Sequence, residues 1–310
     1  MLVISKLSEH VQVIGDAACD ICFGELPRAP APGREVWAGA CALAPGGIAN
    51  TAVALARLDL NVGLTTVLGD DMLGRYVWSS LEREHVDLTY SHRHPGWSTP
   101  VTSAVAYGGE RSLVSYQQPK PLDLASLLPS GFQAGVLMVS LTGASAAWLQ
   151  RIRQHAALVV ADAAWDGGQT TLTELTAKLA QVDVFMPSAA EARAYTGSSD
   201  LYSALQLLTT DQTMVVVTDG AAGAATLHPA DGRFVQIPAA PVTVRDTTGA
   251  GDVFAAGFIY GTLAGWTVEE RLSFANACAG ESVQAISGSF SSPTLSQAAK
   301  QMATRKAMTT

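Results

Sequence analysis

Asp252, which stands at the start of an apolar stretch, is the residue of this sequence best placed to do chemistry. It follows the run 249–251, Gly-Ala-Gly, and precedes the segment 253–264, whose almost uniformly apolar residues predict a helix buried on every side. Backbone N–H groups at such a helix start can hold an anion. A carboxylate beside them can accept a proton from an attacking hydroxyl while the amides stabilise a transferred phosphoryl group. A favourable interaction of Asp252 with the helix dipole alone is the open alternative.

A second glycine cluster, Pro-Gly-Gly-Ile-Ala-Asn at 45–50, offers groups that suit a neutral polyol. Gly46 and Gly47 are expected to form the loop that opens a helix over 48–58 and to let the backbone approach a ligand closely. Asn50 adds both a donor and an acceptor. An ordinary loop before a helix is the alternative.

Two carboxylates, Asp16 and Asp20, follow the first predicted strand, 11–15. Open α/β sheets bind ligands beyond the carboxyl ends of their strands, so both residues are candidates for ligand binding. For Asp16, capping of the next segment is the alternative.

The glycine patterns of two common nucleotide-binding loops are missing from the sequence. No G-x-G-x-x-G run follows the first strand, which argues against a dinucleotide-binding fold. None of the five lysines follows a glycine, which excludes a Walker A loop. A protein of this sequence that handles ATP must hold the phosphates without that lysine.

The elements that position these residues are those of one large α/β domain, expected over 1–310. Hydrophobic residues make up 48% of the chain and charged residues 15%, which provides for a sizeable core. Short β-branched runs alternate with helical segments, as in a mostly parallel sheet between helices. Strands are predicted at 11–15, 62–68, 136–141, 157–161, 184–186 and 214–218, and helices at 48–58, 72–84, 145–154, 171–179, 201–208, 253–264 and 268–284.

The charge balance restricts the partners. Nineteen Lys and Arg against 27 Asp and Glu give a net charge of −8, the wrong sign for neutralising a nucleic-acid backbone. No apolar run is long enough to span a membrane, and the N-terminus lacks a basic region leading into an apolar stretch. We therefore expect a soluble, cytoplasmic protein without a nucleic-acid or membrane partner.

Two segments, about 21–43 and 99–117, interrupt the alternation of strand and helix and read as hairpins. They are predicted to form a small separate sheet, for which a lid over a pocket is a natural use. Ordinary surface excursions are the alternative. Arg111 is the one cation in these segments well placed for a ligand, and a solvated hairpin residue is its alternative.

The runs 46–50, GGIAN, and 246–252, DTTGAGD, resemble the two signatures of the PfkB/ribokinase family of carbohydrate kinases. The first continues through 67–74, VLGDDMLG. The resemblance implies a ribokinase-like three-layer αβα sandwich with a mostly parallel central sheet and a small β-sheet lid. It also implies transfer of the ATP γ-phosphoryl group to a hydroxyl, usually a primary one, and frequent dimers through the lids.

The resemblance also implies a role for each matching residue. Asp252 would be the catalytic base, with Gly249, Ala250 and Gly251 as the anion hole. Asp16, Gly46, Gly47 and Asn50 would hold the substrate, with Asp20 a weaker candidate at the root of the lid. Asp246 and the backbone of Thr248, together with Gly288 and Ser292, would hold a monovalent cation, as in several members.

For the nucleotide, Thr218, Gly220 and Gly223 match the TxGxxG loop of the family, and Asn276 matches a residue beside the adenine. Mg²⁺ is expected mainly through phosphates and water. Glu191 matches the glutamate of the NxxE element that supports this metal indirectly, whereas Ser188 replaces its asparagine.

The departures from the family pattern narrow the acceptor. Ile48 interrupts the GGKGAN run usual in ribokinases, and Leu141 replaces an expected sugar-contacting glutamate, so ribose is disfavoured. A sugar phosphate needs several cations, and near the lid only Arg111 and, farther away, Lys120 are available. The leading hypothesis is an ATP-dependent kinase of a small unphosphorylated sugar or sugar acid. A nucleoside kinase and a non-catalytic sugar-binding regulatory protein are the alternatives, although retention of Asp252 argues against the latter.

Overall fold

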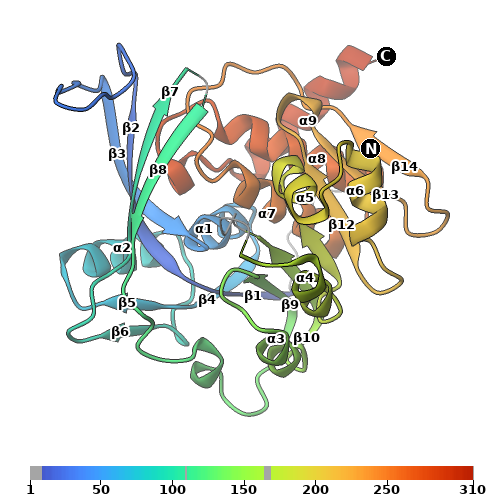
Figure 1. Ribbon diagram of the computed structural model, residues 1–310, viewed down its shortest axis with the longest axis horizontal. Coiled ribbons are helices and arrows are strands. Elements are labelled where there is room, and N and C mark those ends of the chain that lie inside the picture. The colour runs from blue at the N-terminus through green and yellow to red at the C-terminus, as the bar shows by residue number, and fades with distance from the viewer. Residues whose placement is uncertain (1–8, 109, 164–168, 310) are drawn as a thin grey trace.

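The computed structural model describes residues 9–108, 110–163 and 169–309, and its centre is an eight-stranded sheet (Figure 1). From β4 to β12 neighbouring strands run parallel, and β13 and β14 join the far edge in antiparallel orientation. In spatial order the strands are β4 Asn61–Thr65, β1 His10–Ile14, β9 Ala134–Ser140, β10 Ala156–Asp162, β11 Val184–Met186, β12 Met214–Thr218, β13 Ala224–Leu227 and β14 Phe234–Ile237.

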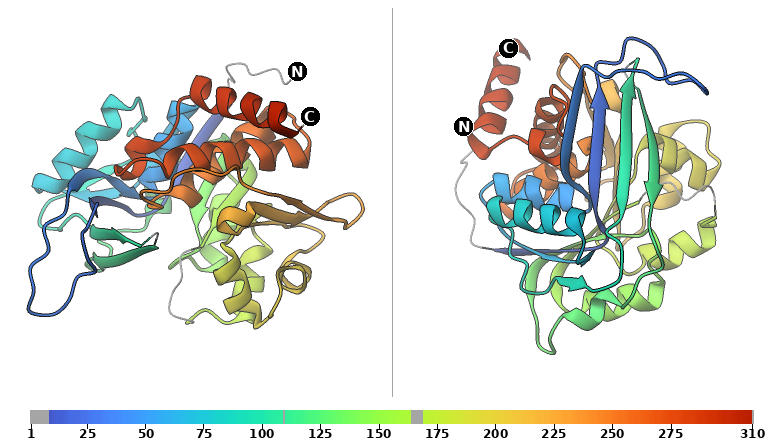
Figure 2. Two further views of the ribbon diagram at one scale, coloured as in Figure 1. Left: turned by 90° about the horizontal axis from the view of Figure 1, so that it is seen from above. Right: turned by 90° about the vertical axis from the view of Figure 1, so that its left-hand side faces the viewer.

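Helices cover both faces of this sheet (Figure 2). Side chains alternate along β9: Val136 and Met138 pack into the core under one set of helices, and Leu137 and Val139 into the core under the other. The first set is α1 Ala49–Arg57, α2 Met72–Arg83, α7 Ala250–Leu263, α8 Val268–Ser282 and α9 Leu295–Thr309, and the second is α3 Ala146–Arg153, α4 Leu172–Leu179, α5 Ala189–Thr196 and α6 Leu201–Leu208. The expected three-layer αβα sandwich is confirmed.

A small sheet stands apart from the central one (Figure 1). Its order is β3 Ala40–Gly47, β2 Ala17–Gly24, β7 Val101–Tyr107 and β8 Glu110–Tyr116. The two irregular segments of the sequence therefore do come together as a separate sheet. A short parallel pair, β5 Val67–Gly69 and β6 His92–His94, lies below it.

Three local expectations are wrong. Gly46 and Gly47 are not a loop but the last residues of β3, paired with Ala18 and Ala17, because β2 begins before residue 21. The single strand expected over 62–68 divides at residue 66 into β4 and β5, which belong to different sheets. The predictions also omitted β13, β14, α5 and α9: the strands are four residues long, and α5 buries only alanines, so neither carries a strong apolar period.

Helix α7 is the buried helix that the sequence predicts, and it starts at Ala250 rather than 253. Its residues 253–261 are all buried between the sheet and α8. At Gly257 a Cβ would lie 2.8 Å from Ala275 Cα and 3.1 Å from Cys278 Sγ, so a glycine lets the two helices approach closely. Despite the apolar character of α7, no helix among the described residues is long and apolar enough to cross a membrane. The cytoplasmic location stays a prediction.

Gly257→Ala should lower the free energy of unfolding by about 1–3 kcal/mol, because the added methyl overpacks the contact between α7 and α8. Gly280→Ala in α8 is the matched control, since a Cβ there meets only Val242 Cγ1 at 3.8 Å. That change should be neutral or stabilise by about 0.5–1 kcal/mol through helix propensity. Denaturant unfolding of both variants checks the pair, and equal effects would contradict the close packing.

Candidate active site

Asp252 lies in the first turn of α7, where it meets α1. Its side chain is partly exposed, and its Oδ1 accepts a hydrogen bond from the hydroxyl of fully buried Thr51 at 2.6 Å. The two glycine-containing segments of the sequence, far apart along the chain, are therefore joined at the start of both helices.

The backbone before Asp252 forms the expected helix start. Gly249 is the N-cap residue of α7 and has a left-handed backbone, φ 77°, which favours glycine. The N–H of Ala250 donates to the carbonyl of Thr247 at 3.2 Å and so is engaged within the turn. Gly251 is exposed, and N–H groups at this position have no acceptor within their own helix. The amides that follow Ala250 are therefore the candidates for holding an anion.

Burial raises the pKa of Asp252 to about 6, although the hydrogen bond from Thr51, the charge of Arg111 and a hydrogen bond from Asn50 all favour its ionised form. The carboxylate is thus mostly ionised at neutral pH and still basic enough to take up a proton. A group that only complemented the helix dipole would not need this environment.

Asp20, the weaker candidate from the sequence, lies in the same group. It is 4% exposed on β2, and burial raises its pKa to about 6, with a further increase from the charge of Asp252. Asn50 and Arg111 lower that pKa. A Cβ at Gly46 would lie 1.9 Å from Asp20 Oδ1, so Gly46 makes room for this carboxylate.

Asp16, the stronger candidate from the sequence, has partners of its own. Its Oδ2 lies 3.0 Å from Lys120 Nζ, and its carbonyl accepts the N–H of Ile48. Gly47, with φ 59°, passes so close that a Cβ would lie 2.3 Å from that carbonyl oxygen. The structure therefore shows Asp20 interacting with Asn50 and Asp252, and Asp16 contacting Lys120 and Ile48.

Arg111 connects the small sheet to the start of α7. Its Nη1 donates to the carbonyl of Thr247, and its charge favours the ionised forms of Asp20 and Asp252. Arg111 is exposed but has a specific partner, so the solvated hairpin alternative does not describe it. Arg111 thus brings β8 of the small sheet close to Asp20 and Asp252.

Asp162 is a candidate that the sequence reasoning missed. It ends β10, and burial raises its pKa to about 7, helped by the charges of Asp252 and Glu191. Its Oδ1 is buried without a hydrogen-bond partner in the described part of the chain. The signal was available, because Asp162 directly follows the predicted strand 157–161, as Asp16 follows the first strand.

The residues expected at the nucleotide gather at the carboxyl ends of β11 and β12. Ser188 pairs with Thr218 in an isolated bridge. Ser188 also caps α5 reciprocally with Glu191: Ser188 N donates to Glu191 Oε2 at 2.7 Å, and Glu191 N donates to Ser188 Oγ at 3.2 Å. The replacement of asparagine by Ser188 thus keeps a local role for Glu191. Gly220 and Gly223 form the turn after β12, where Gly223 N donates to Gly220 O at 3.0 Å.

Asn276, on α8, adjoins that turn, because a Cβ on Gly223 would lie 2.0 Å from the carbonyl oxygen of Ile237. Its Nδ2 donates to the carbonyl of Ile237 at 2.7 Å, at the end of β14. With its neighbours it lines a narrow pocket between α8 and the chain after β14, formed by Ala240, Val242, Asn276, Ala277, Gly280 and Gln301.

The residues expected at a monovalent cation carry buried oxygens without partners. Asp246 Oδ2, Thr248 Oγ1 and Ser292 Oγ have no hydrogen-bond partner among the residues described. Asp246 Oδ1 accepts the N–H of Thr248 at 2.9 Å. Cys22 lies close to both Gly288 and Asp246. A Cβ on Gly288 would lie 3.7 Å from Cys22 Sγ, and the charge of Asp246 adds to burial in raising the pKa of Cys22 to about 12. Buried oxygens normally have partners, so this set fits a bound cation.

The sequence of this chain is similar to a known protein family and to individual relatives named as kinases. Residues 9–295 match the pfkB family of carbohydrate kinases. The chain is 30% identical over 279 residues to the fructokinase of Klebsiella pneumoniae, covering 83% of this chain and 86% of that protein. It is 28% identical over 256 residues to the 5-dehydro-2-deoxygluconokinase of Clostridium tetani, covering 74% and 75%.

Solved structures share the fold. The ribokinase of Arabidopsis thaliana complexed with ribose and ATP superposes with a TM-score of 0.75 at 23% identity, covering 96% of this chain and 99% of that one. A double mutant of the fructokinase of Vibrio cholerae, with fructose, ADP and a potassium ion bound, gives a TM-score of 0.78 at 23% identity, covering 96% and 99%.

Thr51→Val should raise the pKa of Asp252 above about 6, because it removes the hydroxyl whose hydrogen bond favours the ionised carboxylate. The ¹³C shift of the Asp252 carboxyl group, followed against pH and assigned with Asp252→Asn, measures this. Thr51→Ser keeps the hydroxyl and should leave the pKa where it is. An unchanged pKa in Thr51→Val would rule out the hydrogen bond.

Proposed function

The chain belongs to the pfkB family of carbohydrate kinases, and from that premise we propose that it transfers the γ-phosphoryl group of ATP to a hydroxyl of a small unphosphorylated sugar or sugar acid. The observation that carries the proposal is the environment of Asp252. This carboxylate stands beside the amides at the start of α7, hydrogen-bonded to Thr51, with its pKa raised to about 6.

In the proposed reaction Asp252 accepts the proton of the attacking hydroxyl, whose oxygen forms the bond to the γ-phosphorus as the bond to ADP breaks. The amides at the start of α7 stabilise the negative charge of the transferred group. Thr51 holds the carboxylate through its 2.6 Å hydrogen bond, so the base is oriented before the substrate binds.

For the acceptor we assign Asp20 and Asn50, which are both 4% exposed and offer hydrogen-bond acceptors and a donor. Arg111 adds a cation on the same side, which suits a sugar acid as well as a neutral sugar. Relatives of both kinds are similar to this chain, since one is named a fructokinase and another a 5-dehydro-2-deoxygluconokinase. Asp16, which pairs with Lys120 just before β2, stays a further proposed substrate residue, as the sequence predicts.

ATP is assigned to the turn after β12, around Thr218, Gly220 and Gly223. Mg²⁺ would be held mainly by the phosphates and water beside Asp162 and Glu191. The Oδ1 of Asp162, which has no hydrogen-bond partner among the described residues, fits such a neighbour. It would supply positive charge to the transferred phosphoryl group.

K⁺ is assigned to Asp246, Thr248 and Ser292, where buried oxygens lack partners within the described residues. Gly288 starts the 3₁₀ turn Gly288–Ser291 next to Ser292. A cation there would supply positive charge close to the first turn of α7, which begins after Thr248.

Asp252→Asn should fold normally and lower the rate of ADP release by at least about 100-fold, because the proton acceptor is lost. The wild-type rate should fall as the pH drops through about 6, where Asp252 becomes protonated. The assay uses a panel of sugars, sugar acids and nucleosides, with and without K⁺. An undiminished rate in Asp252→Asn would overturn the assignment of Asp252 as the base. A preference for nucleosides in the panel would favour a nucleoside kinase. Binding of a sugar without release of ADP would indicate a sugar-binding protein.

We further propose that the small sheet acts as a lid and that its outer face joins a second copy of the chain. The register places Leu43, Tyr107, Val114 and Tyr116 on the face opposite Asp20, and all four are exposed. Exposed apolar faces of this kind mark interaction sites.

Val114→Asp should convert a dimer into a monomer, because it places a charge at the most exposed of these four side chains, 74% exposed. Leu207→Asp, on α6 and 55% exposed, is the control and should leave the dimer intact. Size-exclusion chromatography with light scattering measures both. A monomeric wild type would exclude this interface.

A further inference from the structure

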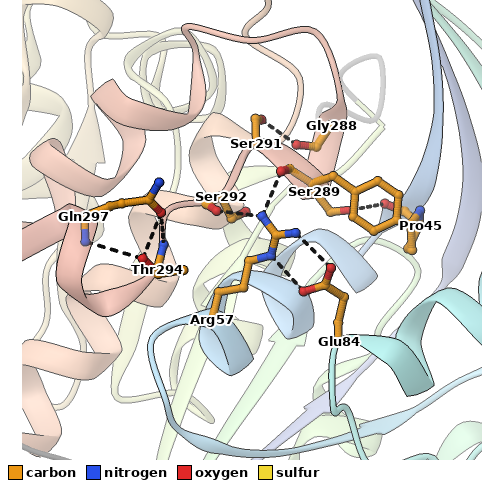
Figure 3. Close-up of polar contacts among 10 residues, drawn as sticks. Pro45, Arg57, Glu84, Gly288, Ser289, Ser291, Ser292, Thr294 and Gln297 are labelled. Carbon is orange, nitrogen blue, oxygen red and sulfur yellow. Dashed lines mark hydrogen bonds and ion pairs between the residues drawn. The ribbon is translucent and has the colours of Figure 1, made fainter.

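Arg57 ends α1 and makes a set of contacts that the proposed reaction does not use (Figure 3). Its Nη1 donates to two backbone carbonyls, those of Phe290 at 2.7 Å and Ser292 at 2.9 Å. Its Nε and Nη2 donate to the two carboxylate oxygens of Glu84, each at 2.8 Å. One guanidinium thus joins the end of α1, the residue after α2 and the segment 288–292.

These contacts form a clamp rather than a surface ion pair. The side chains of Arg57 and Glu84 are only 23% and 20% exposed, and the guanidinium carbon lies 5.9 Å from the centre of the Phe290 ring. The planar fork of arginine directs its donors rigidly, so a bidentate carboxylate on one side orients the donor on the other. Glu84 therefore fixes the direction in which Arg57 holds the two carbonyls.

The clamped segment is otherwise held by its own serines (Figure 3). Ser289 Oγ donates to the carbonyl of Pro45 at 2.8 Å, and Ser291 Oγ donates to the carbonyl of Gly288 at 2.6 Å. The one buried serine hydroxyl here without a partner among the described residues is that of Ser292, whose carbonyl Arg57 binds. Arg57 thus fixes the backbone of the residue whose side chain is left for a ligand.

We propose that Arg57, oriented by Glu84, is a positioning residue that sets the backbone of 288–292 and thereby the affinity of the neighbouring site for a monovalent cation. The proposal rests on the assignment of K⁺ to Asp246, Thr248 and Ser292. A cation binds more tightly when its oxygens are already in place, because the ordering of the segment is not then a cost of binding. A pair that served only to join α1 to α2 would not need the two carbonyls.

The test follows K⁺ binding by the thermal midpoint of unfolding, at constant ionic strength with choline chloride replacing KCl, so the readout is independent of activity. Wild type should be stabilised by K⁺. In Arg57→Met the half-saturating K⁺ concentration should rise by about tenfold, the loss expected when one or two hydrogen bonds of the clamp are removed. The kcat at saturating K⁺ should stay within about twofold of wild type, since Arg57 touches none of the reacting groups.

Two further variants change the clamp in different ways, and a third variant is the control. Arg57→Lys retains the charge but not the fork, and it should restore K⁺ affinity only in part. Glu84→Gln leaves Arg57 in place without its orienting charge, so it should shift the K⁺ constant in the same direction and serves if Arg57→Met does not fold. Arg233→Met is the matched control, because Arg233 pairs with Glu269 at 2.9 Å far from this segment, and its K⁺ constant should equal that of wild type.

The K⁺ site and the role of Arg57 can be contradicted separately. A wild type whose midpoint does not respond to K⁺ would overturn the cation site and the role of Arg57 with it. A wild type that responds, with an Arg57→Met variant that is less stable at every K⁺ concentration but has the same half-saturation, would overturn the role of Arg57 alone and leave the cation site standing.

Discussion

The contact between α1 and α7 is the constraint on which the site depends. Thr51 and Asp252, 201 positions apart in the chain, are joined by a 2.6 Å hydrogen bond. For this bond to form, α7 must lie deep in the structure, and its close packing against α8 at Gly257 permits that. Once the two helix starts meet, Asn50 lies next to Gly249: a Cβ added to Gly249 would lie 3.3 Å from Cγ of Asn50. The geometry around the proposed base is therefore a property of the packed core.

Burial of carboxylates is a second constraint on the site, and it explains why the site needs few positively charged side chains. Burial raises the pKa values of Asp252, Asp20 and Asp162, and the charge of Asp252 raises those of Asp20 and Asp162 further. Arg111 is the cation that the described structure brings to Asp20 and Asp252, in a chain with a net charge of −8. Under the proposed function, the remaining balance comes from bound Mg²⁺ and K⁺ and from backbone amides, which agrees with the missing Walker A lysine.

Much of this was predictable because it is local. The strands 184–186 and 214–218 and the helix 201–208 have the predicted bounds, since each is a short apolar run between clear breaks. The presence of a buried helix after Gly249 was predictable because small residues before a uniformly apolar stretch are a local pattern, although its first residue, Ala250, was not. By contrast, the interaction of Asp20 with Asp252 was not predictable, because Asp16 and Asp20 both follow the same strand. It depends on β2 starting at Ala17, which turns Asp20 towards Asp252 while Asp16 meets Lys120.

The sequence by itself determined the class of fold, the family resemblance and the position of Asp252 at a helix start, since these follow from periodicity and from residues adjacent in the chain. The tertiary structure decided which distant groups meet. The register of β2 with β3 assigns Gly46 to make room for Asp20, and the clamp of Arg57 on the carbonyls of Phe290 and Ser292 spans more than 230 positions. Such pairings depend on the packing of whole elements, whose free energy is distributed over the core, and no local run of residues encodes them.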